Sequence, residues 1–293
     1  MITLVTLKNN LKQVYQKIYY EYCKRHIFAL SSGIRVLPDF IVIGVGRGAT
    51  TTLHHNLSKN PCVFSAAYDE IGFFDENYHL GQNWYRSLFP TKFVKNQSIK
   101  NHNHFLSYEV TPSYIRKPWV ARRIKQVLPK VKLIAILRNP VDRAYSHYNM
   151  GVNESNEQRS FEDIIKKDLT ELEKFKNENT KPDNYFKTIV ENSFLARGFY
   201  AEQLKVWFEI FDKKQIHITT TENLAINPDE TFSKIFSFLE IPDYKIPKLE
   251  NKRKGNYSSI NKEMKIQLLN YFKPYNEELY ELIGQKFNWN DEL

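Results

Sequence analysis

Cysteine is scarce in this sequence, with two residues among 293. Cys23 and Cys62 lie far apart and belong to no Cys-x-x-Cys or Cys/His cluster, so neither a disulfide framework nor a metal site is expected. Long hydrophobic runs are also missing near the N-terminus, where lysines and Arg25 interrupt the apolar residues. We therefore expect reduced thiols, no cleaved signal peptide, no transmembrane anchor and a cytoplasmic protein.

An excess of acidic residues is absent too, because 42 Lys and Arg outnumber 33 Asp and Glu and give a formal net charge of +9. This balance favours anionic partners, but the basic residues are spread along the chain. No helix-turn-helix, aromatic RNA platform or basic helix is recognisable. We expect no nucleic-acid partner, whereas an anionic nucleotide or another polyanionic ligand would fit.

Short apolar runs alternate with helical patterns along most of the chain. The runs have the composition of strands that are buried on both faces of a parallel sheet, and they cover residues 40–45, 105–110, 131–137 and 215–220. Helical patterns follow them at residues 51–59, 118–128, 140–150 and 229–239, and further helices are expected at 161–175 and 261–283. The alternation predicts an α/β fold with a central parallel sheet flanked by helices.

The N-terminal segment differs from the rest. Residues 7–22 carry apolar and aromatic side chains at helical spacing with lysines largely off that face, which predicts an amphipathic helix. Packing onto the domain is the favoured role for this helix, and peripheral membrane contact is open but not indicated. We predict an N-terminal helix and linker at 1–36 and a single domain at 37–293.

The segment from Gly44 to Thr52, GVGRGATTT, connects the first predicted strand to the first predicted helix. Backbone N–H groups and the helix dipole converge on an anion at such a position. Threonine hydroxyls add donors, and Arg47 adds a fixed positive charge. The spacing matches neither GxxxxGK[ST] nor GxGxxG, which disfavours P-loop kinases, ATPases and dinucleotide-binding proteins. A phosphate-binding loop of another kind is predicted.

A second motif, ILRNPVDRAYSHY, spans residues 136–148 and runs from a predicted strand into a helix. Arg138 stands at the end of the strand, and Ser146 lies two turns into the helix. An arginine and a hydroxyl so placed can converge on one phosphate. Arg143 of the same motif is expected to be a structural partner.

The two motifs, in this order, resemble those of the PAPS-dependent sulfotransferases, IGxxKxGTTxL and RNPxxRAxSxY, where PAPS is 3′-phosphoadenylyl sulfate. The resemblance implies a P-loop-like three-layer fold and a sulfotransferase activity without a metal. It implies that Arg138 and Ser146 hold the cofactor 3′-phosphate. The residues implied for the 5′-phosphosulfate are Arg47, Gly48, Ala49, Thr50, Thr51 and Thr52.

Other segments resemble the heparan-sulfate-like, carbohydrate branch of that family. They are EIGFFD with GQNWY at 70–85, EVTPSY at 109–114 and RGFYAEQL at 197–204. These segments imply an acceptor that is a saccharide or another hydroxylated molecule, sulfated on a hydroxyl or an amine. RKGNY resembles the basic cofactor loop and implies cofactor contacts by Arg253, Lys254, Gly255 and Tyr257.

Glu70 matches the general base of the carbohydrate branch, since a carboxylate must take the proton of the acceptor. Asp69 and Glu109 are the alternatives. Arg47 stands where the family usually has Lys, and it can stabilise charge on the leaving phosphate as a second catalytic residue. Val110 replaces another basic residue of the branch. These departures leave open a non-catalytic nucleotide- or polysaccharide-binding protein on the same fold.

Two histidines, His54 and His55, follow the threonines on the same predicted helix. No acid or nucleophile lies at a recognisable spacing from either of them. Both are therefore expected to be packing or surface residues.

Overall fold

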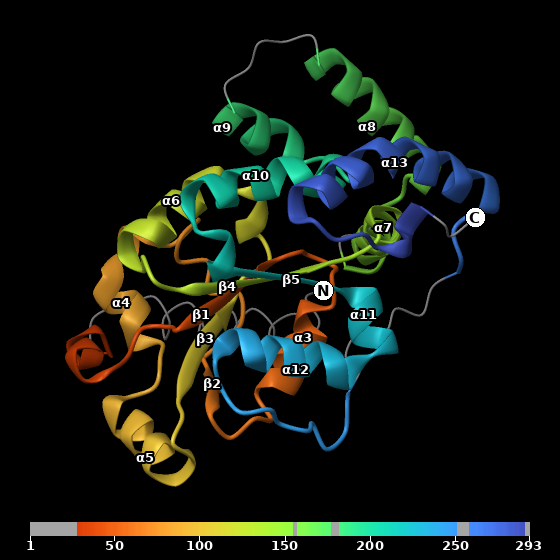
Figure 1. Ribbon diagram of the computed structural model, residues 1–293. Helices are drawn as coiled ribbons and strands as arrows, with labels where there is room; N and C mark the ends of the chain where they lie inside the picture. Colours follow the sequence, from red (N-terminus) through yellow and green to blue (C-terminus); the bar gives the residue numbers. More distant parts are fainter. Residues whose placement is uncertain (1–27, 155–156, 177–181, 251–257, 291–293) are drawn as a thin grey trace, which may run out of the picture.

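The fold is built on one five-stranded parallel sheet, as the computed structural model shows (Figure 1). The structure describes residues 28–154, 157–176, 182–250 and 258–290. Across the sheet the strand order is β2 (Val63–Ser65), β3 (Leu106–Val110), β1 (Phe40–Gly44), β4 (Lys132–Leu137) and β5 (Ile216–Thr220). All four strand pairings are parallel. The predicted α/β fold is confirmed.

Helices cover both faces of the sheet (Figure 1). Every residue of β1 is therefore buried, although alternate side chains point to opposite faces. On one face, Phe40 and Val42 pack with α3 (Thr50–Leu57), α11 (Thr221–Ile226) and α12 (Pro228–Leu239). On the other face, Ile41 and Ile43 belong to a cluster with α6 (Pro118–Val127), α10 (Tyr200–Ile210) and α13 (Lys262–Ile283). The result is three layers.

Most predicted elements agree with the structure to within a few residues. The helix after the second motif, α7 (Pro140–Glu154), runs four residues beyond its predicted end, and α8 (Phe161–Lys176) lies close to its predicted range. The sequence patterns did not predict β2, α4 (Gly81–Ser87), α5 (Lys92–His102) or α10, and α9 (Pro182–Tyr185) is a single turn. Short 3-10 segments are η2 (Phe28–Ile34), η3 (Tyr78–Leu80), η4 (Tyr114–Arg116), η6 (Ala196–Gly198), η7 (Lys213–Gln215) and η8 (Asn288–Asn290), and η5 (Phe186–Val190) is a π-helix.

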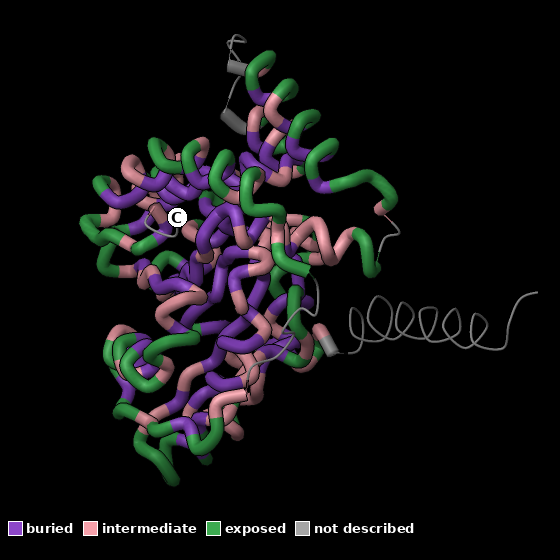
Figure 2. Tube along the Cα trace, turned by 90° about the vertical axis from the view of Figure 1, so that its right-hand side faces the viewer, coloured by how far each residue is buried: buried purple, intermediate pink, exposed green. Residues whose placement is uncertain are grey.

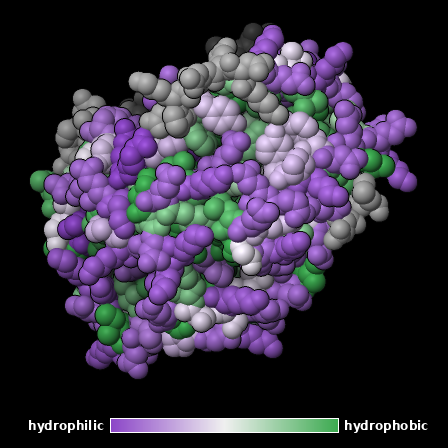
Figure 3. Space-filling view, turned by 45° about the horizontal axis from the view of Figure 1, so that its top comes forward, coloured by the Kyte–Doolittle hydropathy of each residue, from purple (hydrophilic) through white to green (hydrophobic). Residues whose placement is uncertain are grey.

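A third cluster joins α7, α8 and α13 through buried side chains that include Val141, Phe161, Ile165 and Phe272. Figure 2 shows buried residues running through the interior, whereas the outer turns of the helices are exposed. The face drawn in Figure 3 is mostly hydrophilic, with hydrophobic residues gathered near its middle. The predicted helix at 7–22 lies outside the described residues, so the division at residue 36 stays a prediction.

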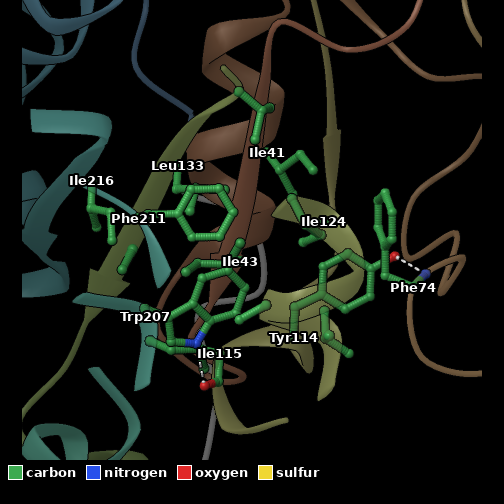
Figure 4. Packing of buried hydrophobic residues seen from close by; sticks show 14 of the residues in the cluster. Ile41, Ile43, Phe74, Tyr114, Ile115, Ile124, Leu133, Trp207, Phe211 and Ile216 are labelled. Carbon is green, nitrogen blue, oxygen red and sulfur yellow. Dashed lines mark hydrogen bonds between the residues drawn. The ribbon is translucent and has the colours of Figure 1, made fainter. Parts of the chain in front are cut away.

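Two hydrogen bonds in the core fix the chain at the carboxyl end of β3. Nε1 of buried Trp207 donates to the Ile115 carbonyl at 2.8 Å, and the Tyr114 hydroxyl accepts from the Phe74 N–H at 3.1 Å (Figure 4). The segments after β2 and after β3 are thereby held together. Because the strands are parallel, their carboxyl ends share one edge of the sheet, which is where ligands bind in open α/β sheets.

Candidate active site

A cavity of about 800 Å³ opens at this edge, beyond the carboxyl ends of β1, β3 and β4. The loop after β1, the segment after β2, the segment after β3 and one face of α7 all contribute to its lining. Five arginines line it: Arg47, Arg116, Arg138, Arg143 and Arg197. Such a concentration of guanidinium groups suits a ligand with several negative charges.

The loop between β1 and α3 presents a helix N-terminus to this cavity. Ala49 is the N-cap and has no side-chain acceptor, so no side chain caps the first N–H groups of α3. Thr50 and Thr51 line the cavity at this end. Arg47 and Ala49 have φ angles of 70° and 62°, a left-handed conformation that costs about 1–3 kcal/mol per non-glycine residue. The loop thus holds a strained shape at the N-terminus of a helix that begins at the cavity, an arrangement typical of anion-binding loops.

Gly48 and Thr52 belong to the same segment but are not among the residues that line the cavity. A Cβ on Gly48 would lie 2.6 Å from the Ile136 carbonyl oxygen and 2.7 Å from a methyl group of Val45. Thr52 is 4% exposed. Glycine is thus required at position 48 by the close approach of the loop to β4, and the predicted cofactor contacts of these two residues stay predictions.

The two sequence motifs meet through Arg47. Its Nε and Nη2 donate to Oγ of Ser146 at 3.1 and 3.0 Å, and its Nη1 lies 3.5 Å from Sδ of Met150. Nη1 of Arg138 donates to the carbonyl oxygen of Arg47 at 3.1 Å. The sequence assigned Arg47 and Ser146 to different ends of the cofactor, whereas the Arg47 guanidinium lies on Ser146 itself.

Two acidic residues, Asp69 and Glu70, line the cavity on the segment that follows β2. Glu70 is exposed, its φ is 53°, and its N–H donates to the Val110 carbonyl at 2.9 Å. This bond ties the backbone of Glu70 to the end of β3. Glu70 therefore has a fixed backbone and an exposed side chain at the cavity.

Glu109, the other alternative for the base, is a core residue. It is 1% exposed and is not among the cavity-lining residues. Its carboxyl group accepts from the hydroxyls of Tyr85 at 2.5 Å and Thr111 at 3.0 Å. Burial raises the pKa of Glu109 to about 7, and the hydrogen bonds from Tyr85 and Thr111 oppose that rise. Glu109 organises the polar groups beneath the cavity, and it is set aside as the base.

His54 has an acidic partner that the sequence pattern did not reveal. Its Nε2 lies 3.1 Å from Oδ1 of Asp69, and its Nδ1 lies 2.9 Å from the hydroxyl of Tyr108. The neighbouring His55 lies 3.1 Å from Oε2 of Glu250. The expectation that both histidines are packing or surface residues stays a prediction, and the acidic partner of His54 arises because β2 brings residue 69 back beside α3.

Three of the five arginines had no predicted binding role. Arg116 contacts Oε2 of Glu191 through Nε at 3.0 Å and Nη2 at 2.9 Å. Arg197 lies 3.1 Å from Nε2 of His147. Arg143 is 2% exposed and donates to the Phe194 carbonyl, which agrees with its predicted structural role, although it also lines the cavity.

Burial and mutual repulsion both lower pKa values within this group. Burial, followed by the charges of Arg116 and Arg143, lowers the pKa of Arg197 to about 9. Burial, followed by the charges of Arg143 and Arg197, lowers the pKa of His147 to about 2, so that its imidazole is neutral at physiological pH. Arg197 stands in the RGFYAEQL segment noted in the sequence, whereas no sequence pattern pointed to Arg116.

The sulfotransferase domain model matches residues 37–278. The chain belongs to the sulfotransferase family. It is 27% identical to the membrane-associated sulfotransferase kil1 of Dictyostelium discoideum and 28% identical to heparan sulfate glucosamine 3-O-sulfotransferase 3B1 of Mus musculus. These matches cover 87% and 90% of this chain, and 67% of each relative.

A third relative is the bifunctional heparan sulfate N-deacetylase/N-sulfotransferase 2 of Homo sapiens, at 26% identity over 89% of this chain and 31% of that protein. The crystal structure of a sulfotransferase from Alicyclobacillus acidocaldarius has the same fold, with a TM-score of 0.64, 22% identity, and coverage of 87% of this chain and 99% of that one. The sulfotransferase family consists of enzymes, so the non-catalytic alternative is set aside.

The expectation of a cytoplasmic sulfotransferase is wrong in the light of these relatives, since kil1 is described as membrane-associated. In the part of the chain that the structure describes, no helix has the length and apolar character needed to cross a membrane. Within the same residues, no group of three or more His, Cys, Asp and Glu side chains could hold a metal ion. The predicted cofactor residues Arg253, Lys254, Gly255 and Tyr257 lie outside the described residues.

Proposed function

We propose that this sulfotransferase moves a sulfuryl group from PAPS to a hydroxyl or an amine of a saccharide, with Glu70 as the general base. The observation that carries the proposal is one cavity lined both by the loop at the N-terminus of α3 and by a carboxylate. The loop contributes Thr50 and Thr51, and Glu70 stands on the segment after β2. Both halves of the reaction, donor binding and acceptor deprotonation, have residues there.

The donor-binding residues fit a nucleotide with two separate anionic groups. The N-terminus of α3 would hold the 5′-phosphosulfate through N–H groups and the hydroxyls of Thr50 and Thr51. Arg138 and Ser146 would hold the 3′-phosphate. Arg47 lies between these two groups of residues, hydrogen-bonded to Ser146, and can share its charge with either anion. When bound, PAPS supplies a sulfuryl group attached to a phosphate that leaves readily.

The protein then contributes a general base and positive charge near the leaving group. Glu70 accepts the acceptor proton as the acceptor oxygen or nitrogen bonds to sulfur, and the bond from sulfur to the phosphate oxygen breaks. Negative charge that develops on the leaving phosphate is stabilised by Arg47 and by the N–H groups of α3. A positioned base contributes typically about 10²–10⁴-fold to such a rate.

A saccharide acceptor is supported by the relatives, two of which are named as heparan sulfate enzymes. The charge of the cavity favours an acidic acceptor in particular. Arg116 and Arg197 add positive charge beyond the residues assigned to the donor, and Arg116 has Glu191 as an acidic partner. An acidic saccharide would balance the remaining charge better than a neutral one.

Thermal unfolding in the presence of adenosine 3′,5′-bisphosphate tests the donor site. A ligand at 100 times its Kd stabilises the folded state by about 2.7 kcal/mol, which raises the Tm by several degrees. Arg138→Gln should lose most of this protection. Arg159→Gln is the matched control, because Arg159 is exposed and paired with Glu157. No protection of the wild-type protein at millimolar bisphosphate would contradict the proposal.

A further inference from the structure

Tyr108, His54 and Asp69 form a chain of side chains that ends at the cavity. Tyr108 is fully buried in β3, where its ring stacks on Phe40 at 4.7 Å. Its hydroxyl lies 2.9 Å from Nδ1 of His54 and 3.1 Å from the His54 carbonyl oxygen. Nε2 of His54 lies 3.1 Å from Oδ1 of Asp69, which lines the cavity. Both ring nitrogens of His54 are thus engaged.

Donor and acceptor chemistry fixes the direction of the hydrogen bond between His54 and Asp69. An ionised carboxylate can only accept, so Nε2 of His54 must carry the hydrogen that faces Asp69. In the neutral imidazole Nδ1 is then an acceptor, and the single O–H of Tyr108 is shared between Nδ1 and the His54 carbonyl oxygen. Burial lowers the pKa of His54, with Asp69 opposing and His55 adding to that shift, which favours the neutral ring.

This row of three hydrogen-bonded side chains connects two parts of the active site. His54 lies on α3, one turn after the threonines that face the donor site. Asp69 directly precedes Glu70, on a segment whose backbone is held by N–H bonds from Ala66 to Tyr108 at 2.8 Å and from Glu70 to Val110 at 2.9 Å. These bonds fix the segment to β3, whereas the His54 contact fixes it to the donor-binding helix.

We propose that His54 is a positioning residue that, through Asp69, sets the place of Glu70 relative to the donor-binding loop. The inference rests on the proposed function and adds to it a residue with an assigned role. It accounts for the position of His54 on α3 between the buried hydroxyl of Tyr108 and the carboxylate of Asp69.

The relative effects on stability and on rate distinguish a positioning role from simple stabilisation of the fold. The side chain of Asp69 is 54% exposed and that of His54 is 18% exposed. An ion pair or hydrogen bond this close to solvent contributes little to folding. Active-site geometry is more demanding, since misplacement by about 1 Å can cost on the order of 100-fold in rate. Loss of the contact should therefore lower turnover far more than it lowers stability.

The test compares sulfate transfer from labelled PAPS to de-N-acetylated heparosan by His54→Ala, His54→Gln, Asp69→Ala and the His54→Ala/Asp69→Ala double variant. We expect about a tenfold loss of kcat in His54→Ala and Asp69→Ala, with little change in the donor KM or in protection by the bisphosphate. The double variant should be no slower than either single variant. His54→Gln should recover much of the rate, because its amide can donate to Asp69 from a similar place.

His55→Gln is the matched control, since its partner is Glu250 on another segment, and it should keep wild-type kcat. Wild-type kcat in His54→Ala, or losses that multiply in the double variant, would overturn the inference. If His54→Ala did not fold, Asp69→Ala and His54→Gln would still decide it, because Asp69→Ala removes the acceptor of the His54 N–H and wild-type kcat in that variant has the same meaning. Failure of the wild-type protein to bind the bisphosphate or to transfer sulfate would instead count against the proposed function.

Discussion

The guanidinium of Arg47 donates two hydrogen bonds to the hydroxyl of Ser146, across a separation of 99 residues in the sequence. The contact joins the loop after β1 to the helix after β4. It also places the arginine that replaces the usual loop lysine at the end of the cavity where Arg138 lies. A single cation can then serve both anionic groups of the donor.

Substitution of Arg47 tests this shared role. Arg47→Ala should weaken binding of adenosine 3′,5′-bisphosphate about 10- to 100-fold, because a charged hydrogen bond is worth about 1.5–3 kcal/mol. Arg47→Lys should give an intermediate affinity, since lysine keeps the charge but loses the planar fork that bridges two groups. Titration calorimetry measures both. An Arg47→Ala variant that bound the bisphosphate as tightly as wild type would remove Arg47 from the donor site.

Gly48 should tolerate no side chain. Gly48→Ala would force a Cβ to within 2.6 Å of a backbone oxygen of β4, and such overpacking costs about 1–3 kcal/mol of unfolding free energy. Gly46→Ala is the matched control in the same loop, because a Cβ there would meet no atom within 4 Å. Chemical denaturation compares the two variants. Equal stability would show that the loop does not depend on its approach to β4.

Substitution of Arg116 should weaken binding of the acceptor and leave binding of the donor unchanged. Arg116→Gln removes a positive charge from the cavity while Lys117, 3.5 Å from Oε1 of Glu191, still faces that carboxylate. We expect the KM for an acidic polysaccharide to rise about tenfold, with the bisphosphate affinity unchanged. A carboxyl-reduced form of the same polysaccharide should show a smaller effect. An equal effect on both acceptors, or weaker bisphosphate binding, would contradict this assignment.

Glu109 should make folding stability depend on pH. Its pKa is about 7 in the folded protein, against an ordinary value of 4.5, so the folded state binds more protons than the unfolded state between these values. Stability from this group is therefore fully present below pH 4.5 and is lost as the pH rises to about 7. At about 1.4 kcal/mol per pKa unit, the loss is about 3 kcal/mol.

Glu109→Gln isolates that contribution. The difference in unfolding free energy between wild type and variant, measured by denaturation from pH 4.5 to 8, should shift in favour of the variant as the pH rises. The hydroxyls of Tyr85 and Thr111 can still donate to the amide oxygen of the variant. A difference that stayed constant with pH would show that Glu109 titrates normally.

The sequence was sufficient for the sheet and for most of its helices because each depends on local pattern. Strands such as residues 40–45 are nearly all apolar, and the helix at 118–128 begins with proline, so the expected elements match β1 and α6 closely. Arg47, Arg138, Ser146 and Glu70 could be proposed because they stand in recognisable motifs, and all four line the same cavity.

Contacts between distant segments could not be predicted in this way. The three-residue strand β2 carries too weak a pattern to be recognised, yet it brings Asp69 beside His54. Arg116 follows a recognised segment without belonging to it, and the residue before it, Ile115, accepts a hydrogen bond from Trp207, which is distant in the sequence. The Arg47 contact with Ser146 depends on the side-by-side pairing of β1 and β4, which no local pattern encodes.

The most direct test of the central claim is the rate of sulfate transfer from labelled PAPS to de-N-acetylated heparosan by wild type and Glu70→Gln. The glutamine keeps the size of the side chain but cannot accept the acceptor proton. The account predicts a kcat about 10²–10⁴-fold below wild type, with unchanged protection by adenosine 3′,5′-bisphosphate. A Glu70→Gln variant that transferred sulfate at the wild-type rate would contradict it.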